Sequence, residues 1–519
     1  MHYGIQKLRG LISTRWPLLG LVLVYVVVGA MLVFMNTAVA GWADPIEYMQ
    51  GAQDLANYES AFHPPLYSAV MALVNLPVGD LFLAGKLVSY LAGIAIILLT
   101  WGLGRLCFGG EKIALLATAL VVLSPTMLRH TYSVSADMLG TALFLAVVYM
   151  LARSSRGSYR DMVLAGILTG LACLTRAVFC SVLPAAVIFL VMIVPGKIKQ
   201  RITFTLVFAV AFLVVVSPWA IHNILRHGDL HNLNYVNIAF AALDTSGSWL
   251  WFDTYPDRYP SLLSLLTQHP LLILRHVAKN ALHFPAEIVV RYGLLAGVVS
   301  ILGLLWALRR PSPQRMALVL NGAALLLLLL LAWLRQRFFV PLLPIIFLFA
   351  AYYMLSGLAT TAASYWPRHG QGWPLLRKIP LKGPVVFLSL AVALTVSVIQ
   401  VPGDLAWANI DDEKKAAAYL AASTPADTRI LTSSRNLAWY ADRPFVSAAV
   451  MREVSAEHLE EAVAATGAQV LVYSERHSTF LQPQLRFLLN PGDSLVPPGF
   501  RLLYHDDGEW PVVAYLVGE

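Results

Sequence analysis

The chain has 519 residues, of which 58% are hydrophobic and 13% are charged, with a mean hydropathy of +0.67. Soluble globular domains carry about 25% charged residues, so this composition excludes a soluble protein and predicts a polytopic α-helical membrane protein. The net charge of +8 is typical of basic cytoplasmic loops in a membrane protein and does not predict a nucleic-acid partner. The three cysteines lie in or beside apolar segments, so no disulfide framework is indicated.

Eleven apolar segments of about membrane-spanning length follow one another along the chain. They cover residues 17–39, 86–106, 112–128, 137–152, 162–177, 179–195, 203–221, 288–308, 316–334, 338–358 and 383–401. If the N-terminus is cytoplasmic, the lysines and arginines cluster in the loops of the cytoplasmic side, as the positive-inside rule requires. We therefore predict about 11 transmembrane helices, with the chain after the last of them on the outer side.

Two domains are expected. Residues 1–402 form the transmembrane domain, with large outer loops at 40–85, which holds two helix-like stretches, and at 222–287. Residues 403–519 alternate between helix and strand patterns, which predicts a small α/β domain. The expected helices there are 411–422, 436–441, 455–465 and 482–489, and the expected strands are 428–433, 469–474, 500–505 and 512–517. The acidic start of the first helix, Asp411-Asp412-Glu413, is interpreted as a solvated N-terminus.

Several charged residues do not follow the positive-inside pattern, because they lie at the predicted outer ends of spans. Charged side chains near the membrane are costly, so they are functional candidates by default. They are Asp44, Lys86, Arg129, Asp137, Arg176, Arg335 and Arg337, with Glu47 and His63 nearby. A carboxylate can take a proton from an acceptor hydroxyl, and cations can hold a phosphate and stabilise the charge of a leaving group. This set predicts transfer chemistry on an anionic lipid head group.

Each of these residues also has a structural interpretation. Asp44-Pro45-Ile46-Glu47 matches a helix N-cap with proline at the first helical position and an acid at the third. Capping and catalysis are compatible, because a capping carboxylate is held ionised.

The other charges leave similar alternatives open. Lys86 could be an interfacial lysine that snorkels, and Arg129 could meet lipid head groups. Asp137 could cap a helix or pair with an arginine, and one of Arg335 and Arg337 could only snorkel. The histidines lack metal-ligand spacing and no outer Asp-x-Asp motif lies near Asp44, so a metal site is not predicted.

Short motifs in chain order carry a family resemblance. They are ADPIEYMQGAQDL, HPPLYSAVMAL, SPTMLRHTYSVSADML, LAGILTGLACLTRAV, SPWAIHNILRHGDL, QHPLLILRHVAKNALHF and RQRFFVPLLPIIFLFAA. With them the chain resembles the membrane glycosyltransferases of the C superfamily over nearly its whole length. The resemblance is to the bacterial branch that includes protein O-mannosyltransferases and aminoarabinose transferases of lipid A.

The resemblance implies roles for the charged residues. Asp44 looks like the base that activates the acceptor, and Asp137 looks like the second loop carboxylate. Lys86, with Arg335, Arg337 or both, looks like a set of ligands for the lipid phosphate. The candidates for further phosphate contacts are Arg129 and Arg176, and those for lining the site are Glu47, His63 and Tyr67.

Three positions depart from the family pattern. Ala43 stands where a second acid is common, His63 where a cation, often lysine, is common, and His222 where arginine is common. Recognition of the donor is therefore expected to differ from that of better-known members.

The sequence thus predicts a glycosyltransferase in the bacterial inner membrane, with its C-terminal domain in the periplasm. It would move a sugar from a polyprenyl-phosphate donor to a lipid, polysaccharide or protein hydroxyl, with inversion and without a cofactor. The partners would be this donor, the acceptor and membrane lipids. A lipid transporter or flippase is the main alternative, and a non-catalytic scaffold is a third. The odd number of spans and the lack of an inverted repeat argue against a transporter.

Overall fold

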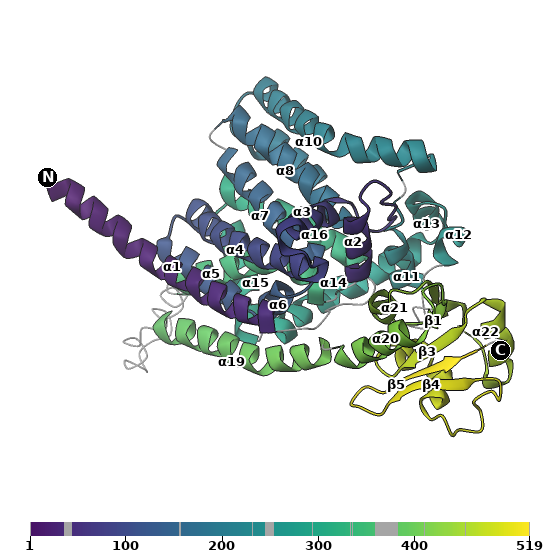
Figure 1. The fold of residues 1–519 in the computed structure, drawn as a ribbon. Coiled ribbons are helices and arrows are strands. Elements are labelled where there is room, and N and C mark those ends of the chain that lie inside the picture. Colours follow the sequence, from purple (N-terminus) through teal and green to yellow (C-terminus); the bar gives the residue numbers. More distant parts are fainter. Residues whose placement is uncertain are drawn as a thin grey trace. The chain divides into compact units, whose positions relative to one another are not determined.

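The computed structural model describes residues 2–35, 44–154, 157–230, 232–243, 254–292, 294–332, 334, 336–358, 382–408, 410–451 and 453–517. The chain folds into two compact units, which are described separately (Figure 1). Unit 1 comprises Met1–Asn36, Gly51–Leu243 and Ser261–Trp407, and unit 2 comprises Thr37–Gln50, Asp244–Pro260 and Ala408–Glu519. The domain division at residue 402 stays a prediction.

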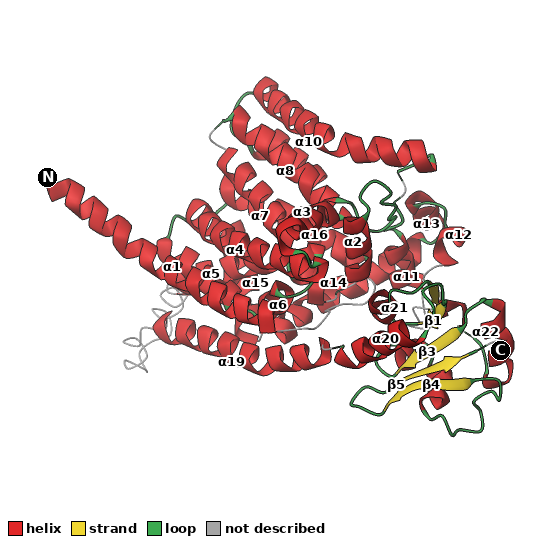
Figure 2. Ribbon diagram, in the orientation of Figure 1, coloured by secondary structure: helices red, strands yellow, loops and turns green. Residues whose placement is uncertain are grey.

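Unit 1 consists of helices in its described part (Figure 2). Its α-helices are α1 (His2–Met35), α3 (Leu66–Val78), α4 (Leu81–Phe108), α5 (Glu111–Val122), α6 (Pro125–Thr131), α7 (Ala136–Ser154), α8 (Tyr159–Thr175), α9 (Val182–Ile188), α10 (Ile198–His227), α11 (Val236–Leu243), α13 (Leu262–Gln268), α14 (Pro270–Tyr292), α15 (Leu294–Leu308), α16 (Pro313–Leu331), α17 (Leu343–Tyr352) and α19 (Lys382–Ala408). Short 3₁₀ or π-helical turns join them: η1 (Ala177–Ser181), η2 (Phe189–Ile193), η4 (Gln336–Phe339) and η5 (Tyr353–Gly357).

Membrane-spanning helices are present as predicted. In the described part of the chain, six helices are long and apolar enough to cross a membrane, or seven if the bent pair α5–α6 counts as one span. Each of the apolar segments found in the sequence overlaps at least one helix of the structure. The protein is therefore a multi-pass membrane protein, while the number of 11 spans stays a prediction.

The structure differs from the sequence interpretation in two places of unit 1. The segment 112–128 is not one straight helix, because α5 ends at Val122 and Pro125 starts α6 at an angle of 60°. The segment 222–287, predicted as a loop, contains α11, α13 and most of α14. Its polar and aromatic composition masked these shorter helices.

Small residues bring α8 and α10 close together. Gly166 and Gly170 are four residues apart, so they lie on one face of α8. A Cβ atom added at Gly166 would lie 2.8 Å from the Cβ of Ala211, and one added at Gly170 would lie 2.8 Å from the Cβ of Val215. Such small-xxx-small patterns allow membrane helices to pack tightly. This packing fixes the end of α8, where Arg176 follows.

The C-terminal part of unit 2 is a small α/β fold, as predicted. Its elements are α20 (Asp411–Ser423), β1 (Ile430–Thr432), α21 (Arg435–Ala441), β2 (Phe445–Ser447), η7 (Ala448–Met451), η8 (Ala456–His458), α22 (Leu459–Ala465), β3 (Val470–Ser474), α23 (Ser478–Leu481), η9 (Pro483–Leu489), β4 (Arg501–Asp506) and β5 (Val512–Leu516). The sheet order is β2-β1-β3-β5-β4. Strands β1, β2 and β3 are parallel, whereas β5 runs antiparallel to β3 and β4. The short strand β2 was not predicted.

The sheet of unit 2 has an apolar core on each face. Alternate residues of a strand point to opposite faces. Val470 and Val472 of β3 pack in one core with α20 and α21, whereas Leu471 and Tyr473 pack in the other with α22 and η9. Earlier in the chain, unit 2 also includes α12 (Tyr255–Arg258) and the first part of α2 (Asp44–Gln53).

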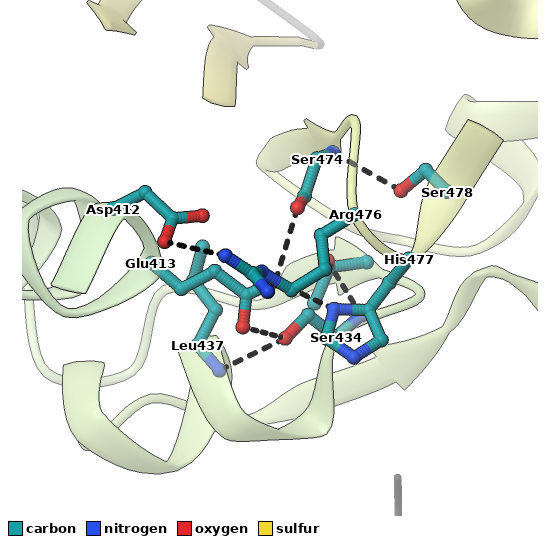
Figure 3. A network of polar contacts seen from close by, with 9 residues as sticks. Asp412, Glu413, Ser434, Leu437, Ser474, Arg476, His477 and Ser478 are labelled. Carbon is teal, nitrogen blue, oxygen red and sulfur yellow. Dashed lines mark hydrogen bonds and ion pairs between the residues drawn. The ribbon is translucent and has the colours of Figure 1, made fainter. Parts of the chain in front are cut away.

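The interpretation of Asp411-Asp412-Glu413 as a solvated N-terminus was wrong for Glu413. Its side chain is fully buried (0% exposed). The carboxylate accepts hydrogen bonds from the hydroxyls of Ser434 (2.7 Å) and Ser474 (3.0 Å), and it pairs with the His477 ring (2.7 Å) (Figure 3). These partners come from distant parts of the sequence, so local composition could not reveal them.

Candidate functional site

Asp137 and Arg176 form a buried ion pair in unit 1. Asp137 lies in the first turn of α7 and is 3% exposed. A guanidinium nitrogen of Arg176 donates to one of its carboxylate oxygens, and the Ser135 hydroxyl donates to the other at 2.7 Å. Arg176 has extended backbone between the end of α8 and η1. Of the two structural alternatives that the sequence left open for Asp137, the structure therefore shows pairing with an arginine.

Further cations gather beside this pair. The guanidinium of Arg176 lies 5.2 Å from the ring centre of Phe338, and that of Arg337 lies 4.9 Å from the same ring. Both distances are within cation–π range. Arg337 also interacts electrostatically with Asp137. Two arginines from distant parts of the chain thus share one aromatic ring next to a single carboxylate.

Helix α6 adds Arg129 and His130 to the same place. His130 interacts electrostatically with Asp137, Arg129, Arg176 and Arg337. We call Arg129, His130, Asp137, Arg176 and Arg337 the arginine cluster. Three guanidinium groups and one carboxylate thus belong to this cluster. Arginines bind phosphate oxygens through charge-assisted hydrogen bonds, so this composition suits an anionic ligand.

His130 is the member of the cluster that the sequence reasoning missed. Its side chain is 7% exposed, and its Nδ1 atom has no hydrogen-bond partner among the described residues. Buried polar atoms in native proteins normally have a partner, so this atom calls for an explanation. The signal was its position within SPTMLRHTYSVSADML, one residue after Arg129 and seven before Asp137.

Tyr67 holds the segment that leads into Asp137. It is fully buried. Its hydroxyl donates to the Gly85 carbonyl oxygen at 2.9 Å and accepts from the backbone N–H of Ser135 at 2.9 Å. The Ser89 hydroxyl donates to the Ser133 carbonyl oxygen at 2.6 Å. These bonds tie residues 133–135 to α3 and α4, so Tyr67 supports the site through Ser135.

Lys86 is buried in the same unit. It is 3% exposed, and its ammonium group donates to the carbonyl oxygen of Val33 at 3.3 Å, near the end of α1. It also lies 4.4 Å from the ring centre of Phe82. Protein covers the side chain, which does not fit the snorkelling alternative. Lys86 precedes Ser89 by about one helical turn, so α4 carries both toward the segment that holds Asp137.

His63 lines a separate cavity of unit 1. The cavity has a volume of about 170 Å³ and lies between the loop at residues 60–64, the end of α8, α10 and the loop at 230–234. Trp219, Asn223 and Cys173 are among its other lining residues. The loop is fixed by hydrogen bonds from the His63 N–H to the Ser60 hydroxyl (3.0 Å) and from the Tyr58 hydroxyl to the His63 carbonyl oxygen (2.7 Å).

Asp44 and Glu47 belong to unit 2. Helix α2 (Asp44–Gln53) has both acids in its first turn. Glu47 pairs with Arg435, whose Nη1 donates to its Oε1 at 2.7 Å. The capping and catalytic roles of Asp44 stay predictions. Arg335, a predicted phosphate ligand, lies outside the described residues.

Comparison with known proteins finds a matching family model and similar solved structures. Residues 62–222 match the family model described as dolichyl-phosphate-mannose-protein mannosyltransferase. ArnT from Cupriavidus metallidurans in the apo state is 16% identical, with a TM-score of 0.59 over 97% of this chain and 98% of that one. The same protein bound to undecaprenyl phosphate gives a TM-score of 0.58 at 16% identity, with the same coverage.

A second similar structure is an oligosaccharyltransferase. AglB from Archaeoglobus fulgidus, in complex with an inhibitory peptide and a dolichol-phosphate, is 12% identical. Its TM-score is 0.58, over 88% of this chain and 69% of that one. No curated protein matches the chain by sequence.

The chain therefore has the fold of the C-superfamily membrane glycosyltransferases, which confirms the fold class and the resemblance predicted from the sequence. The family match at residues 62–222 lies within this fold. Within the matched region lie Lys86, Asp137 and Arg176.

Proposed function

We propose that this protein transfers a sugar from a polyprenyl-phosphate donor to a hydroxyl group of an extracytoplasmic lipid, glycan or protein, with inversion at the anomeric carbon. The observation that carries the proposal is the arginine cluster. It is a buried carboxylate clustered with three arginines, in a fold whose similar structures include ArnT with undecaprenyl phosphate and AglB with a dolichol-phosphate.

In the proposed reaction the donor phosphate binds to the cations of unit 1. Arg337 and Arg129 are proposed as its contacts, and Arg176 is held beside them by its hydrogen bond to Asp137. Lys86 and Arg335 complete the proposed set. Asp137 acts as the anchor that holds Arg176, and the open Nδ1 of His130 binds an oxygen of the donor.

Asp44 is the proposed general base. It accepts the proton of the acceptor hydroxyl, whose oxygen attacks C1 of the sugar while the bond from C1 to the phosphate oxygen breaks. The electron pair of that bond leaves with the polyprenyl phosphate. Fixed positive charges stabilise the charge that develops there, which is commonly the largest contribution to this kind of catalysis.

We further propose that the N-terminus is cytoplasmic and that unit 2 lies on the periplasmic side of a bacterial inner membrane. Loop charge supports this orientation. We also propose that transfer needs no metal ion. Among the described residues, no group of three His, Cys, Asp or Glu side chains is arranged to bind one.

The test begins with mass spectrometry of the lipids that co-purify with the full chain. We expect a polyprenyl phosphate or its glycosylated form. Purified protein in proteoliposomes is then offered a panel of polyprenyl-phosphate sugars, and release of the polyprenyl phosphate is measured with and without a chelator. Transfer from one donor, unaffected by the chelator, is the expected result. Movement of intact donor across the bilayer without cleavage of the C1–oxygen bond would contradict the proposal and favour a flippase.

A further inference from the structure

Glu47 and Arg435 connect two parts of unit 2 that lie far apart in the sequence. The ion pair has a distance of 2.7 Å, and the two side chains are 26% and 41% exposed. Glu47 follows Asp44 by three residues in α2, so the two acids lie on neighbouring positions of one helix face. Arg435 is therefore attached to the turn of helix that carries the proposed base.

Arg435 itself stands on a rigid support. It is the first residue of α21, and the preceding Ser434 caps that helix by accepting a hydrogen bond from the Leu437 N–H at 3.3 Å. The same hydroxyl donates to Glu413, which is held in turn by Ser474 and His477 (Figure 3). The Arg435 guanidinium also lies 5.9 Å from the ring centre of Phe445 in β2. The start of α21 is thus fixed to the sheet.

Stability does not explain the contact well. A partly exposed ion pair between flexible side chains contributes little to the free energy of unfolding. Its geometric effect can be larger, because a misplacement of about 1 Å of a reacting group can cost on the order of 10²-fold in rate. The contact joins the fixed start of α21 to the turn of α2 that carries Asp44. It is therefore better explained by placement of a reacting group than by stability.

We infer that Arg435 is a positioning residue for the proposed reaction: through Glu47 it holds the first turn of α2 and thereby aims the carboxylate of Asp44. The inference rests on the proposed function, and it goes further by giving the small α/β fold an indirect part in catalysis. Arg435 does not touch the donor or the acceptor in this account. Its whole effect passes through Glu47.

The test uses the full chain in proteoliposomes with the donor found above. Arg435→Gln and Glu47→Gln should each lower kcat by about 10- to 100-fold, with the KM for the donor and the melting temperature nearly unchanged. Arg435→Lys keeps the charge and should retain most activity. The exchanged pair, Glu47→Arg with Arg435→Glu, restores the attraction and should recover at least part of kcat. The matched control is Arg486→Gln, which removes an exposed ion pair to Glu475 (2.9 Å) elsewhere in unit 2 and should leave kcat unchanged.

Three outcomes overturn the inference. Wild-type kcat in Arg435→Gln would show that the contact has no catalytic effect. A raised donor KM that the exchanged pair does not correct would show that Arg435 binds substrate directly. A fall in melting temperature that accounts for the lost activity would show a purely structural role. Asp44→Asn separates these results from failure of the proposed function, because that variant must be inactive whatever Arg435 does. If Asp44→Asn turns over normally, it is the proposed base that is wrong.

Discussion

Asp137 in unit 1 and Glu413 in unit 2 are both buried carboxylates, but their surroundings differ. Glu413 has two serine hydroxyls and one histidine as partners, and both of its oxygens accept hydrogen bonds. Asp137 pairs with Arg176 and Ser135, while Arg337, Arg129 and the open Nδ1 of His130 lie in the same cluster. The partners of Glu413 are hydroxyls and a histidine, whereas the cluster around Asp137 includes three arginines.

The two surroundings suit different roles. Burial alone raises the pKa of the Glu413 carboxyl, but His477 and the two hydroxyls more than offset it and hold this pKa below its usual value. Its charge is therefore satisfied from within unit 2. The cluster around Asp137 contains three arginines, and we propose that they bind an anion. The following variants test this comparison.

The largest effect is expected from Arg176→Leu. It leaves the buried carboxylate of Asp137 without its main partner, which typically costs about 3–5 kcal/mol. We expect a much lower melting temperature in detergent and loss of transfer. Adding Asp137→Leu removes the orphaned charge, so the double variant should recover most of the stability but not the activity. Arg105→Leu, which breaks an exposed pair with Glu111 (3.1 Å), serves as the control. A wild-type melting temperature for Arg176→Leu would show that the pair is not a structural anchor.

Arg337→Gln should act on the donor rather than on the fold. Arg337 packs on the ring of Phe338, and its replacement does not remove the hydrogen bond between Arg176 and Asp137. Hydrogen bonds to charged groups contribute about 1.5–3 kcal/mol, so the KM for the donor should rise about 10- to 100-fold. Melting should change little. Arg310→Gln removes a comparable stacked arginine, 4.8 Å from the ring of Trp306, and should leave the KM unchanged. An unchanged KM in Arg337→Gln would remove it from the phosphate site.

Glu413→Gln tests the network around Glu413 through its pH dependence. Because the folded-state pKa of Glu413 is lowered, its contribution to stability is fully present above the ordinary value of 4.5 and is lost as the pH falls through the lower folded-state pKa. The variant should be less stable near neutral pH by about 1–3 kcal/mol and should lose this acid dependence. Hydrogen exchange of residues 410–517 in the full chain measures both effects. If the variant lost stability at acidic pH in the same way as the wild type, Glu413 would not be the source of this pH dependence.

Tyr67→Phe should have a small effect on both stability and activity. It removes the bond from Tyr67 to Gly85 and the bond from Ser135 to Tyr67, at a cost of about 1 kcal/mol. A several-fold fall in kcat should accompany it, because Ser135 orients Asp137. Tyr90→Phe removes a hydroxyl bond to Val26 (3.0 Å) and should lower stability alone. Equal kcat values for the two variants would show that Tyr67 has no role in the site.

Hydropathy predicted the membrane class and the helical segments, and alternating helix and strand patterns predicted most elements of the small α/β fold. The cost of charge at membrane depth also singled out Asp137 and Arg176, which form an ion pair in the structure. Two features of unit 1 were missed although local signals exist for them. Pro125 marks the break after α5, and α11, α13 and most of α14 lie in the segment 222–287 that was interpreted as a loop.

The residues that were missed or misjudged depend mostly on contacts between distant parts of the chain. Glu413 was interpreted as solvated because its partners Ser474 and His477 come more than 60 residues later. His130 resembles an ordinary loop histidine until Asp137 and the arginines gather around it. The link from Glu47 to Arg435 spans 388 residues. No spacing rule within a short segment can reveal the contacts of Glu413 and Glu47, whereas His130 lies in the same short motif as Arg129 and Asp137.

The central claim is that a polyprenyl-phosphate sugar is cleaved with Asp44 as the base. The most direct measurement is single-turnover transfer by Asp44→Asn and wild-type protein in proteoliposomes, normalised to folded protein by melting. We predict that the variant binds the donor and melts like the wild type but transfers no sugar. Normal transfer by Asp44→Asn would contradict the claim. A large fall in melting temperature, with activity in proportion to folded protein, would instead assign Asp44 to helix capping.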